Sequence, residues 1–341
     1  MGLLCLAVLG AFVVLLIQPL VSAEELTNPV VYTIQENYRA TNPGPGDAAV
    51  TIYLLRNWSD WARQQVLAEI LPSGQVPSTV DNKAIPISIS PGTHTIAFTQ
   101  TVMVYGYDLQ LDPSVIGDSV QADFGHTSFV DGLWENKPEL VAKARELTDS
   151  QPNFYCKAKA IFEFVRDNIQ YEQTSPIYSA YETYQYRYGD CADKANLFIG
   201  LCRSVGIPAK FVSCYGYRPE YSSRLSDDAS LGHAFAIVYF PEVGWAPVDL
   251  TWDSPEGLFG KLGSDHIIFA TSDGNDMFSL KYLGELVSPD VARIWGPSGC
   301  SIEREGFSAV REVALKVETD SAANEIIDGK WKWFVRVKNI G

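Results

Sequence analysis

The sequence has few basic residues and few histidines, and these shortages exclude several classes of protein. Its 341 residues include 26 Lys and Arg against 41 Asp and Glu, which gives a net charge of −15 at pH 7. Nucleic-acid binding needs a basic face, and Lys and Arg form no cluster, so no nucleic-acid partner is expected. His94, His126 and His266 are scattered and no Cys-x-x-Cys spacing occurs, so a structural zinc site is not expected.

The rest of the composition is that of a globular protein. Hydrophobic residues make up 46% of the chain and charged residues 20%, which argues against wholesale disorder. The chain is long enough for two domains, each with its own core. Residues 273–276, Asp-Gly-Asn-Asp, resemble a fragment of a calcium loop but lack the spacing of an EF-hand, so we expect no metal. No cofactor is expected, and the sequence indicates no oligomeric state.

The first residues are typical of a secretory signal. Residues 2–17 are apolar or glycine without interruption, and residues 18–19, Gln-Pro, break the run. Val21, Ser22 and Ala23 then resemble a small-residue cleavage site. We therefore predict that residues 1–23 are a signal peptide, with an uncleaved N-terminal anchor as the alternative. In both cases the protein is secreted or lies at the cell surface, and its only contact with a membrane is this segment.

A β-rich region follows the signal. Runs of β-branched and aromatic residues occur at residues 30–34, 49–55, 84–89 and 93–107, separated by Pro- and Gly-rich turns. This spacing predicts an antiparallel β-sandwich of immunoglobulin type over residues 24–111. Trp58 and Trp61 fall in an irregular stretch, residues 56–70, and are expected to be core aromatics. Residues 112–136, which mix Pro, Gly and acidic residues, are predicted to be a linker.

Cys191 lies where the sequence predicts the start of a half-buried helix. Apolar residues follow it at helical spacing, namely Ala195, Phe198, Ile199, Cys202 and Val205. Asp190 is a suitable N-cap, Gly206 suits the left-handed position after the helix, and Pro208 prevents its continuation. The helix dipole would favour a thiolate at Cys191 by roughly 0.3–1 kcal/mol, which does not by itself make it a nucleophile.

A histidine and an aspartate follow in an order that suits thiol catalysis. His233 begins a strand-like run, residues 233–240, and a turn leads into a second run that ends near Asp249. A hairpin of this kind would bring His233 beside Asp249. Cys191, His233 and Asp249 would then be nucleophile, base and orienting acid.

These residues resemble the core pattern of the transglutaminase-like superfamily, in three separated blocks that span about residues 154–269. The matching positions are Gly189, Cys191, Ala195, Leu197, Arg203, residues 206–209, Gly216, Tyr217, His233, Ala234, Gly244, Trp245, residues 247–249 and Thr251. The chain departs from the family at Phe235 and Ile237, where Trp and Glu are common. Both positions are expected to touch the substrate groove, so they bear on substrate preference.

The resemblance implies a fold and an activity. It implies an α+β, papain-like core over residues 137–285, and it agrees with a preceding β-sandwich. It also implies a cysteine protease or amidase acting on a peptide or protein through a thioester, typical of an extracytoplasmic microbial member. The alternatives are a protein-glutamine transamidase, a peptide N-glycanase-like amidase, or a non-catalytic surface module that binds peptide or glycan.

Two features of the sequence leave alternatives open. Besides Cys5 and Cys191, four cysteines remain, and they either form up to two disulfides or are all reduced: Cys156, Cys202, Cys214 and Cys300. Strand-like runs reappear in residues 286–341, a β-rich C-terminal segment. They would either close the core sheet or begin a further β-module that is truncated after Gly341.

Overall fold

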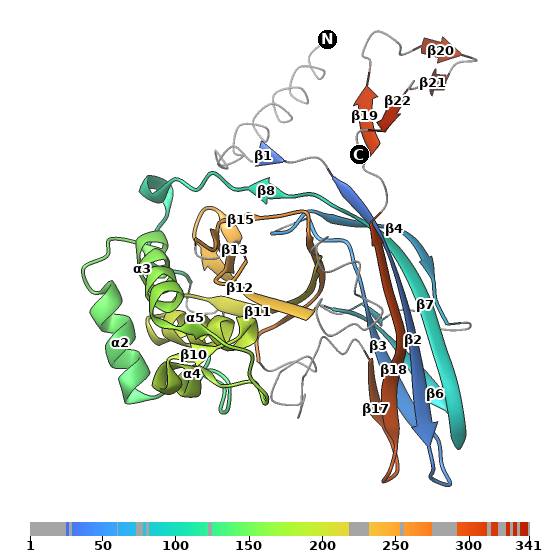
Figure 1. Ribbon diagram of the computed structural model, residues 1–341. Coiled ribbons are helices and arrows are strands. Elements are labelled where there is room, and N and C mark those ends of the chain that lie inside the picture. Colours follow the sequence, from blue (N-terminus) through green and yellow to red (C-terminus); the bar gives the residue numbers. More distant parts are fainter. Residues whose placement is uncertain are drawn as a thin grey trace, which may run out of the picture.

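The computed structural model describes most of the chain. The described residues are 25–26, 29–59, 61–72, 78–79, 82–121, 125–217, 232–252, 256–274, 292–311, 315–319, 325–327, 330–332 and 335–339. They form a β-sandwich and a mixed α/β core that lie side by side (Figure 1). The predicted signal or anchor, residues 1–23, lies outside them. In the described part of the chain, no helix has the length and apolar character needed to cross a membrane.

Two four-stranded antiparallel sheets form the sandwich and share one hydrophobic core. The first sheet has the order β18 (Ser301–Arg311), β2 (Val30–Asn42), β7 (Gly92–Val104), β4 (Gln64–Ile70). The second has the order β17 (Ala292–Trp295), β3 (Ala48–Leu54), β6 (Lys83–Ile89), β5 (Ser78–Thr79). Alternate residues of β2 are buried, as the two-residue period of a strand with one face in a core requires. The immunoglobulin type of the sandwich stays a prediction.

The sandwich contains strands that the sequence did not assign to it. Residues 64–70, in the predicted irregular stretch, form the edge strand β4, which is mostly exposed and therefore has no apolar alternation. Strands β17 and β18 come from the C-terminal segment, yet they pair with β3 and β2. They neither close the core sheet nor begin a separate module, because a strand takes its partner from the whole fold and not from its neighbours in sequence.

The core is a five-stranded sheet with helices on one side. The sheet has the order β14 (Leu258–Phe259), β13 (Gly244–Asp249), β12 (Gly232–Phe240), β11 (Ala209–Gly216), β16 (His266–Ser272). The helices are α2 (Pro138–Thr148), α3 (Phe154–Asn168), α4 (Ala180–Tyr186) and α5 (Cys191–Ser204), and they lie away from the sandwich (Figure 1). Tyr215, Ile267 and Phe269, from β11 and β16, belong to the core of the sandwich instead.

Two side-chain amides join the sandwich to the open edge of the core sheet. Gln64 accepts a hydrogen bond from Ile268 N–H (2.8 Å) and donates one to Ile268 C=O (2.7 Å). Asn82 does the same with Thr271, at 3.0 and 2.9 Å. Each amide thus takes the place that a neighbouring strand would fill beside β16. The edge strand of the core is closed by the sandwich, which removes an exposed row of backbone groups.

The predicted linker, residues 112–136, packs onto the core. Ile116, Val130, Leu133 and Trp134 are buried in the core's hydrophobic cluster. The Trp134 indole N–H donates to Asn196 Oδ1 on α5 at 3.0 Å. Residues 112–136 therefore help to hold α5 in position.

The described chain also contains short sheets. Strand β9 (Gln170–Tyr171) pairs in parallel with β10 (Tyr188–Gly189), directly before α5. Strand β8 (Tyr107–Asp108) lies between β1 (Glu25–Leu26) and β15 (Lys261–Leu262). Near the end of the chain, β19 (Leu315–Thr319) pairs with β22 (Val335–Asn339), and β20 (Glu325–Ile327) pairs with β21 (Lys330–Lys332).

Candidate active site

Cys191 is the first residue of α5, as the sequence predicts. Asp190 is the N-cap, and its carboxylate accepts hydrogen bonds from the N–H groups of Ala192 (2.8 Å) and Asp193 (3.2 Å). Asp193 in turn accepts from Asp190 N–H at 2.9 Å, which completes a capping box. The Cys191 thiol is half-buried, so it lies within reach of a substrate at the positive end of the helix dipole.

The backbone around Cys191 leaves one donor of the first helical turn available. Asp190 C=O accepts from Lys194 N–H at 3.0 Å, and its side chain takes the two N–H groups between. In the part of the chain that the structure describes, no residue accepts a hydrogen bond from Cys191 N–H. This N–H is therefore able to donate to a ligand at the sulfur.

Asp193 holds the segment that precedes Cys191 in place. Its side chain is fully buried and also accepts from Tyr178 N–H (2.7 Å) and the Thr174 hydroxyl (2.5 Å). A Cβ at Gly189 would lie 2.5 Å from the Asp193 Cβ, so only glycine fits there. Burial, with the Asp193 charge added, raises the pKa of Asp190 to about 6.

The other end of α5 is fixed by a Schellman motif and by Arg203. Gly206 has a φ of 77°, and the N–H groups of Ile207 and Gly206 donate to Cys202 C=O and Arg203 C=O. The Arg203 guanidinium lies 4.1 Å from the centre of the Trp134 ring. It donates to the carbonyls of Ala209, Ser128 and Asp273.

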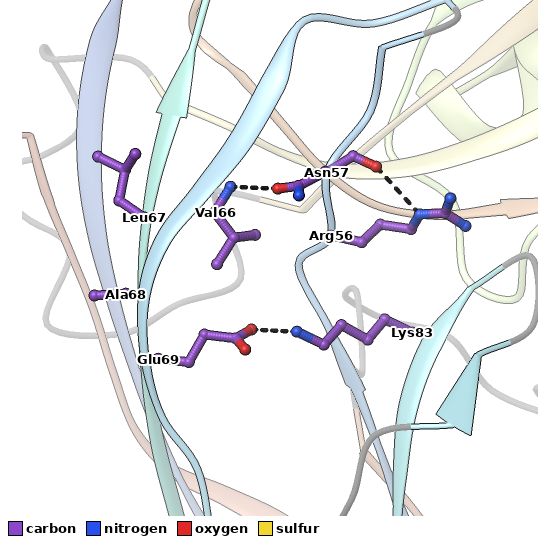
Figure 2. Close-up of a pocket in the computed structure, with 7 residues that line it drawn as sticks. All are labelled: Arg56, Asn57, Val66, Leu67, Ala68, Glu69 and Lys83. Atoms are coloured by element: carbon purple, nitrogen blue, oxygen red, sulfur yellow. Dashed lines mark hydrogen bonds and ion pairs between the residues drawn. The ribbon is translucent and has the colours of Figure 1, made fainter. Parts of the chain in front are cut away.

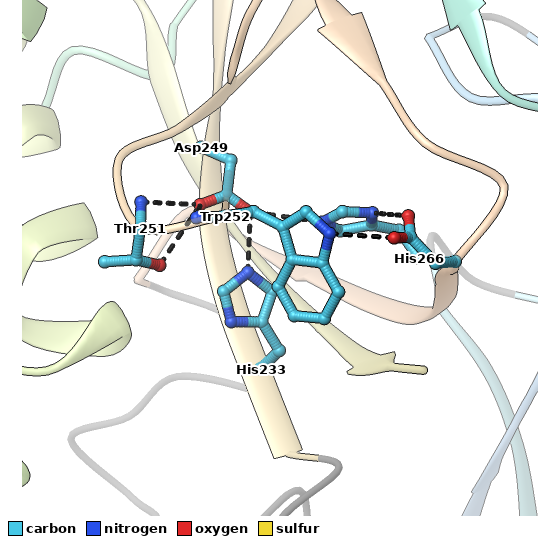
Figure 3. Close-up of polar contacts among 6 residues, drawn as sticks. His233, Asp249, Thr251, Trp252 and His266 are labelled. Carbon is cyan, nitrogen blue, oxygen red and sulfur yellow. Dashed lines mark hydrogen bonds and ion pairs between the residues drawn. The ribbon is translucent and has the colours of Figure 1, made fainter. Parts of the chain in front are cut away.

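His233 and Asp249 come together through the hairpin that the sequence predicts. Strands β12 and β13 pair with Ala236 opposite Val248, so Asp249 lies opposite Phe235 and diagonal to His233 on the same face. His233 Nε2 and Asp249 Oδ2 are 2.6 Å apart (Figure 3). Burial lowers the pKa of His233, but the Asp249 charge and this hydrogen bond raise it to about 9.

Cys191 approaches His233 from helix α5. The Cys191 side chain adds to the rise in the pKa of His233, so the two side chains lie near each other. Because Nε2 faces Asp249, Nδ1 is the ring nitrogen left for the thiol. The structure therefore brings together the three side chains that the sequence selects, namely Cys191, His233 and Asp249. In the sequence, 58 positions separate the first from the last.

Asp249 is fully buried, and both of its carboxylate oxygens accept hydrogen bonds (Figure 3). Its Oδ1 accepts from Thr251 N–H (2.9 Å), the Thr251 hydroxyl (3.2 Å) and Trp252 N–H (2.9 Å). Burial alone would raise the pKa of Asp249, but the charges of and hydrogen bonds from His233 and His266 hold it well below the usual range. Asp249 is thus a carboxylate at neutral pH.

Three residues that the sequence assigned no role complete this cluster: His266, Trp252 and Asp265. His266 Nε2 lies 3.2 Å from Asp249 Oδ2, and its Nδ1 lies 2.8 Å from Asp265 Oδ1. The Trp252 ring packs between the histidines, 4.8 Å from His233 and 4.7 Å from His266, and its N–H donates to Asp265 Oδ2. A Cβ at Gly216 would lie 2.5 Å from the Trp252 ring, so this glycine makes room for it. The adjacent pair Asp265-His266 at a strand start is the signal that could have found them.

The tyrosines before Cys191 divide into two groups. Tyr178, Tyr186 and Tyr188 pack against one another with ring centres 5.1–6.0 Å apart, and Tyr178 is joined to α5 through Asp193. Tyr181 and Tyr184 face cations, Lys137 and Arg187.

The His233, Asp249 and His266 side chains are also of the types that bind metals. One potential ligand atom from each lies within 4.8 Å of the others. In the structure these atoms are hydrogen-bonded to one another instead, with Asp249 Oδ2 shared by both rings. In the calcium-like segment, Asp273 C=O accepts from Arg203, and Asp276 lies outside the described residues. The expectation of no metal stays a prediction.

The described cysteines other than Cys191 have free thiols. Cys202 and Cys214 are buried, and Cys156 and Cys300 are half-buried. Burial raises the pKa of Cys202 and Cys214 well above the ordinary value, which makes both thiols inert.

A cavity of about 520 Å³ lies on the sandwich, and its lining carries no nucleophile or histidine (Figure 2). Lys83 and Glu69 form an ion pair at 2.5 Å, and Asn57 accepts a hydrogen bond from Val66 N–H. These polar groups satisfy one another. Among the described residues, the candidate nucleophile and its histidine therefore lie at Cys191 and not at this cavity.

Residues 141–250 match the profile of the Transglutaminase-like superfamily. The chain contains a transglutaminase-like domain. It is also 27% identical over 135 residues to the "Uncharacterized protein YebA" of Bacillus subtilis (strain 168), a match that covers 35% of this chain and 18% of YebA. The chain thus spans less than a fifth of that relative.

Two solved structures are similar to this chain. "A Putative Cysteine Protease from Cytophaga hutchinsonii" has a TM-score of 0.56 at 18% identity, over 85% of this chain and 93% of that one. The periplasmic domain of TgpA from Pseudomonas aeruginosa has a TM-score of 0.35 at 16% identity, over 67% of this chain and 92% of that one. The first likeness shows a shared fold that includes both the sandwich and the core, since it covers most of each chain. The second is too distant to support an argument.

Proposed function

We propose that the chain is a thiol-dependent acyl-transfer enzyme that hydrolyses peptide or amide bonds. Cys191 is the nucleophile, His233 the general acid and base, and Asp249 the carboxylate that orients His233. The transglutaminase-like domain supports a thiol-dependent enzyme in general. The observation that carries the finer assignment is a half-buried thiol at a helix start, near a histidine whose Nε2 lies 2.6 Å from a buried carboxylate.

The reaction proceeds in two halves. With a pKa of about 9, His233 is an imidazolium at neutral pH. In the proposed mechanism its charge stabilises the attacking sulfur as a thiolate. The sulfur attacks the amide carbonyl carbon, and Cys191 N–H donates to the oxygen that becomes negative. The C–N bond breaks as His233 gives its proton to the leaving amine, which leaves a thioester on Cys191. Water then attacks the thioester and passes a proton to His233, and the C–S bond breaks to release the carboxylic acid and restore the Cys191 thiolate beside the His233 imidazolium.

Replacing water by an amine in the second half would give transamidation through the same thioester. Feeding a primary amine to the enzyme together with a glutaminyl peptide separates the two reactions. Under our proposal the free acid is the main product, whereas an amine adduct as the main product would favour a transamidase.

The proposal is tested first by thiol reactivity, which needs no knowledge of the substrate. Iodoacetamide at mildly acidic pH should alkylate Cys191, whereas Cys156 and Cys300, which are also half-buried, are internal controls that should stay unmodified. Equal labelling of the three thiols would argue against an activated nucleophile.

Turnover supplies the second test. Cys191→Ala should abolish cleavage of a peptide library, while Cys300→Ala, in the sandwich, should leave it unchanged. Undiminished turnover by Cys191→Ala would refute the assignment and favour a non-catalytic binding module.

We further propose that the protein acts outside the cytoplasm, on the basis of the apolar run at residues 2–17 and the small residues at 21–23. N-terminal sequencing of the native protein should find a chain that begins near Glu24, or an intact N-terminus in the membrane fraction. An intact Met1 on cytosolic protein would contradict this location.

A further inference from the structure

His266 is a fully buried histidine with both ring nitrogens on carboxylates. Nε2 faces Asp249 Oδ2 at 3.2 Å and Nδ1 faces Asp265 Oδ1 at 2.8 Å. The ring is enclosed by Trp252 on one side and by Phe235, whose ring is perpendicular to it at 5.7 Å. The ring is therefore held in place on all sides, and both groups that contact its nitrogens are negatively charged.

The geometry fixes the protonation state of this ring. A neutral imidazole has one N–H and one lone pair, so one of its nitrogens would present a lone pair to a carboxylate that can only accept. An imidazolium has two N–H groups and satisfies both carboxylates. Burying this charge is permissible because it is paired on both sides. The hydrogen bonds to Asp249 and Asp265 outweigh burial and raise the pKa of His266 to about 9, which agrees with the geometry.

His266 and His233 share one oxygen atom. Asp249 Oδ2 accepts from His233 at 2.6 Å and from His266 at 3.2 Å, and the two ring centres are 5.5 Å apart. Since Thr251 and Trp252 hold Oδ1, the carboxylate is prevented from turning by donors on both oxygens. A change at His266 therefore acts on the same atom that orients His233.

We propose that His266 is a positioning residue. As an imidazolium held by Asp265, it fixes Asp249 from the side opposite His233. Its positive charge also offsets part of the negative charge of Asp249 that acts on His233. The site is thus a line of five groups, Cys191, His233, Asp249, His266 and Asp265, which ends at a partly exposed carboxylate. This inference rests on the proposed function.

The charged and titratable groups around His266 come from several elements. They are Asp249 on β13, His233 on β12 and Asp265 before β16, and Cys214 on β11 lies near the same two carboxylates. Cys214 is an uncharged thiol because burial raises its pKa well above the ordinary value. A pH effect of a substitution at His266 is therefore expected to pass through Asp249 and His233.

The test is the rate of Cys191 alkylation by iodoacetamide, measured with EDTA present from about pH 4 to about pH 10. His266→Gln keeps an N–H donor for Asp249 but removes the positive charge. The upper inflection of the profile, set by His233, should move to a pH about one unit higher, because a like charge has been taken away. His266→Phe removes donor and charge, and the rate at pH 7 should fall about 10- to 100-fold.

Controls separate this role from a structural one. His94→Gln, in the sandwich, should leave the profile unchanged. Asp265→Asn weakens the hold on the His266 proton without touching Asp249, so it should move the inflection in the same direction by less. If His266→Gln lowers the melting temperature but its profile superimposes on that of the wild type, the inference is overturned.

The wild-type protein supplies a measurement that does not depend on folding of the variants. Ring ¹⁵N signals of His266 should show two protonated nitrogens up to about pH 8. A deprotonated ring nitrogen at pH 7 would overturn the inference. If wild-type Cys191 reacts no faster than Cys156 and Cys300, the proposed function fails instead, so the two failures are distinguishable.

Discussion

Replacing Gln64 by leucine should destabilise the contact between the sandwich and the core sheet. Gln64 is 3% exposed, and its amide is the hydrogen-bond partner of both Ile268 N–H and Ile268 C=O. Leucine has a similar size and can make neither bond. Strand β16 would then lose part of the support along its outer edge.

The structure sets the size of the effect. Ile268 is 1% exposed, so water cannot easily replace the amide. A buried backbone group without a partner costs about 1–3 kcal/mol, and two such groups give a loss of about 2–6 kcal/mol in the free energy of unfolding. The third bond of Gln64, to Arg56 C=O at 3.0 Å, is nearer the surface and adds little.

Urea unfolding followed by tryptophan fluorescence measures this loss. The matched control is Gln65→Leu, since Gln65 is the next residue of the same strand and is exposed, so its substitution should change stability by less than about 0.5 kcal/mol. Gln64→Glu is a graded case: it keeps an acceptor for Ile268 N–H but presents a carboxylate to the carbonyl. Equal unfolding midpoints for Gln64→Leu and Gln65→Leu would refute the idea that this amide takes the place of a strand.

Three further predictions follow from the site. Asp193→Ala removes the acceptor for Asp190 N–H and Tyr178 N–H and should cost about 1–3 kcal/mol, with faster proteolysis before Cys191 as the readout; unchanged proteolysis would contradict it. Arg203→Lys cannot serve three carbonyls and stack on Trp134 at once, and should lower the melting temperature more than Arg145→Lys on the exposed face of α2. The pKa values of His233 and His266 are raised to about 9, against about 6.5 in an unfolded chain. Their stabilisation is therefore complete below about pH 6.5 and is lost as the pH rises through 9, so the melting temperature should fall over this interval and fall less in His266→Gln; a flat wild-type curve would be evidence against this reasoning.

The sandwich contributes to the site as well as standing before it in the chain. Gln64 and Asn82 hold β16, the strand that begins with His266. The ring of Trp61, also from the sandwich side, packs on Phe235, which in turn contacts His233 and His266. A core domain without its sandwich would therefore lose packing directly beneath the proposed base.

Local signals in the sequence were sufficient for the proposed nucleophile and its partners. Asp190, Gly206 and the apolar spacing after Cys191 bound one helix, and the observed helix begins and ends there with the cap and the Schellman motif. The turn between two β runs was enough to predict that His233 and Asp249 would lie side by side. These features depend on residues that are close in sequence, so backbone propensity and turn chemistry determine them.

Only the tertiary structure decided which residues surround Cys191, His233 and Asp249. His266 reaches Asp249 although β12 and β11 lie between their strands, and Gly216 on β11 leaves space for Trp252. Gln64 finds Ile268 across 204 positions, and β18 joins β2 from the far end of the chain. No local pattern marks such partners, since a buried amide or imidazole is satisfied by whichever group the packing brings to it. The sequence by itself determined the helix with its thiol and the hairpin with its base and acid, and long-range packing determined how they are held.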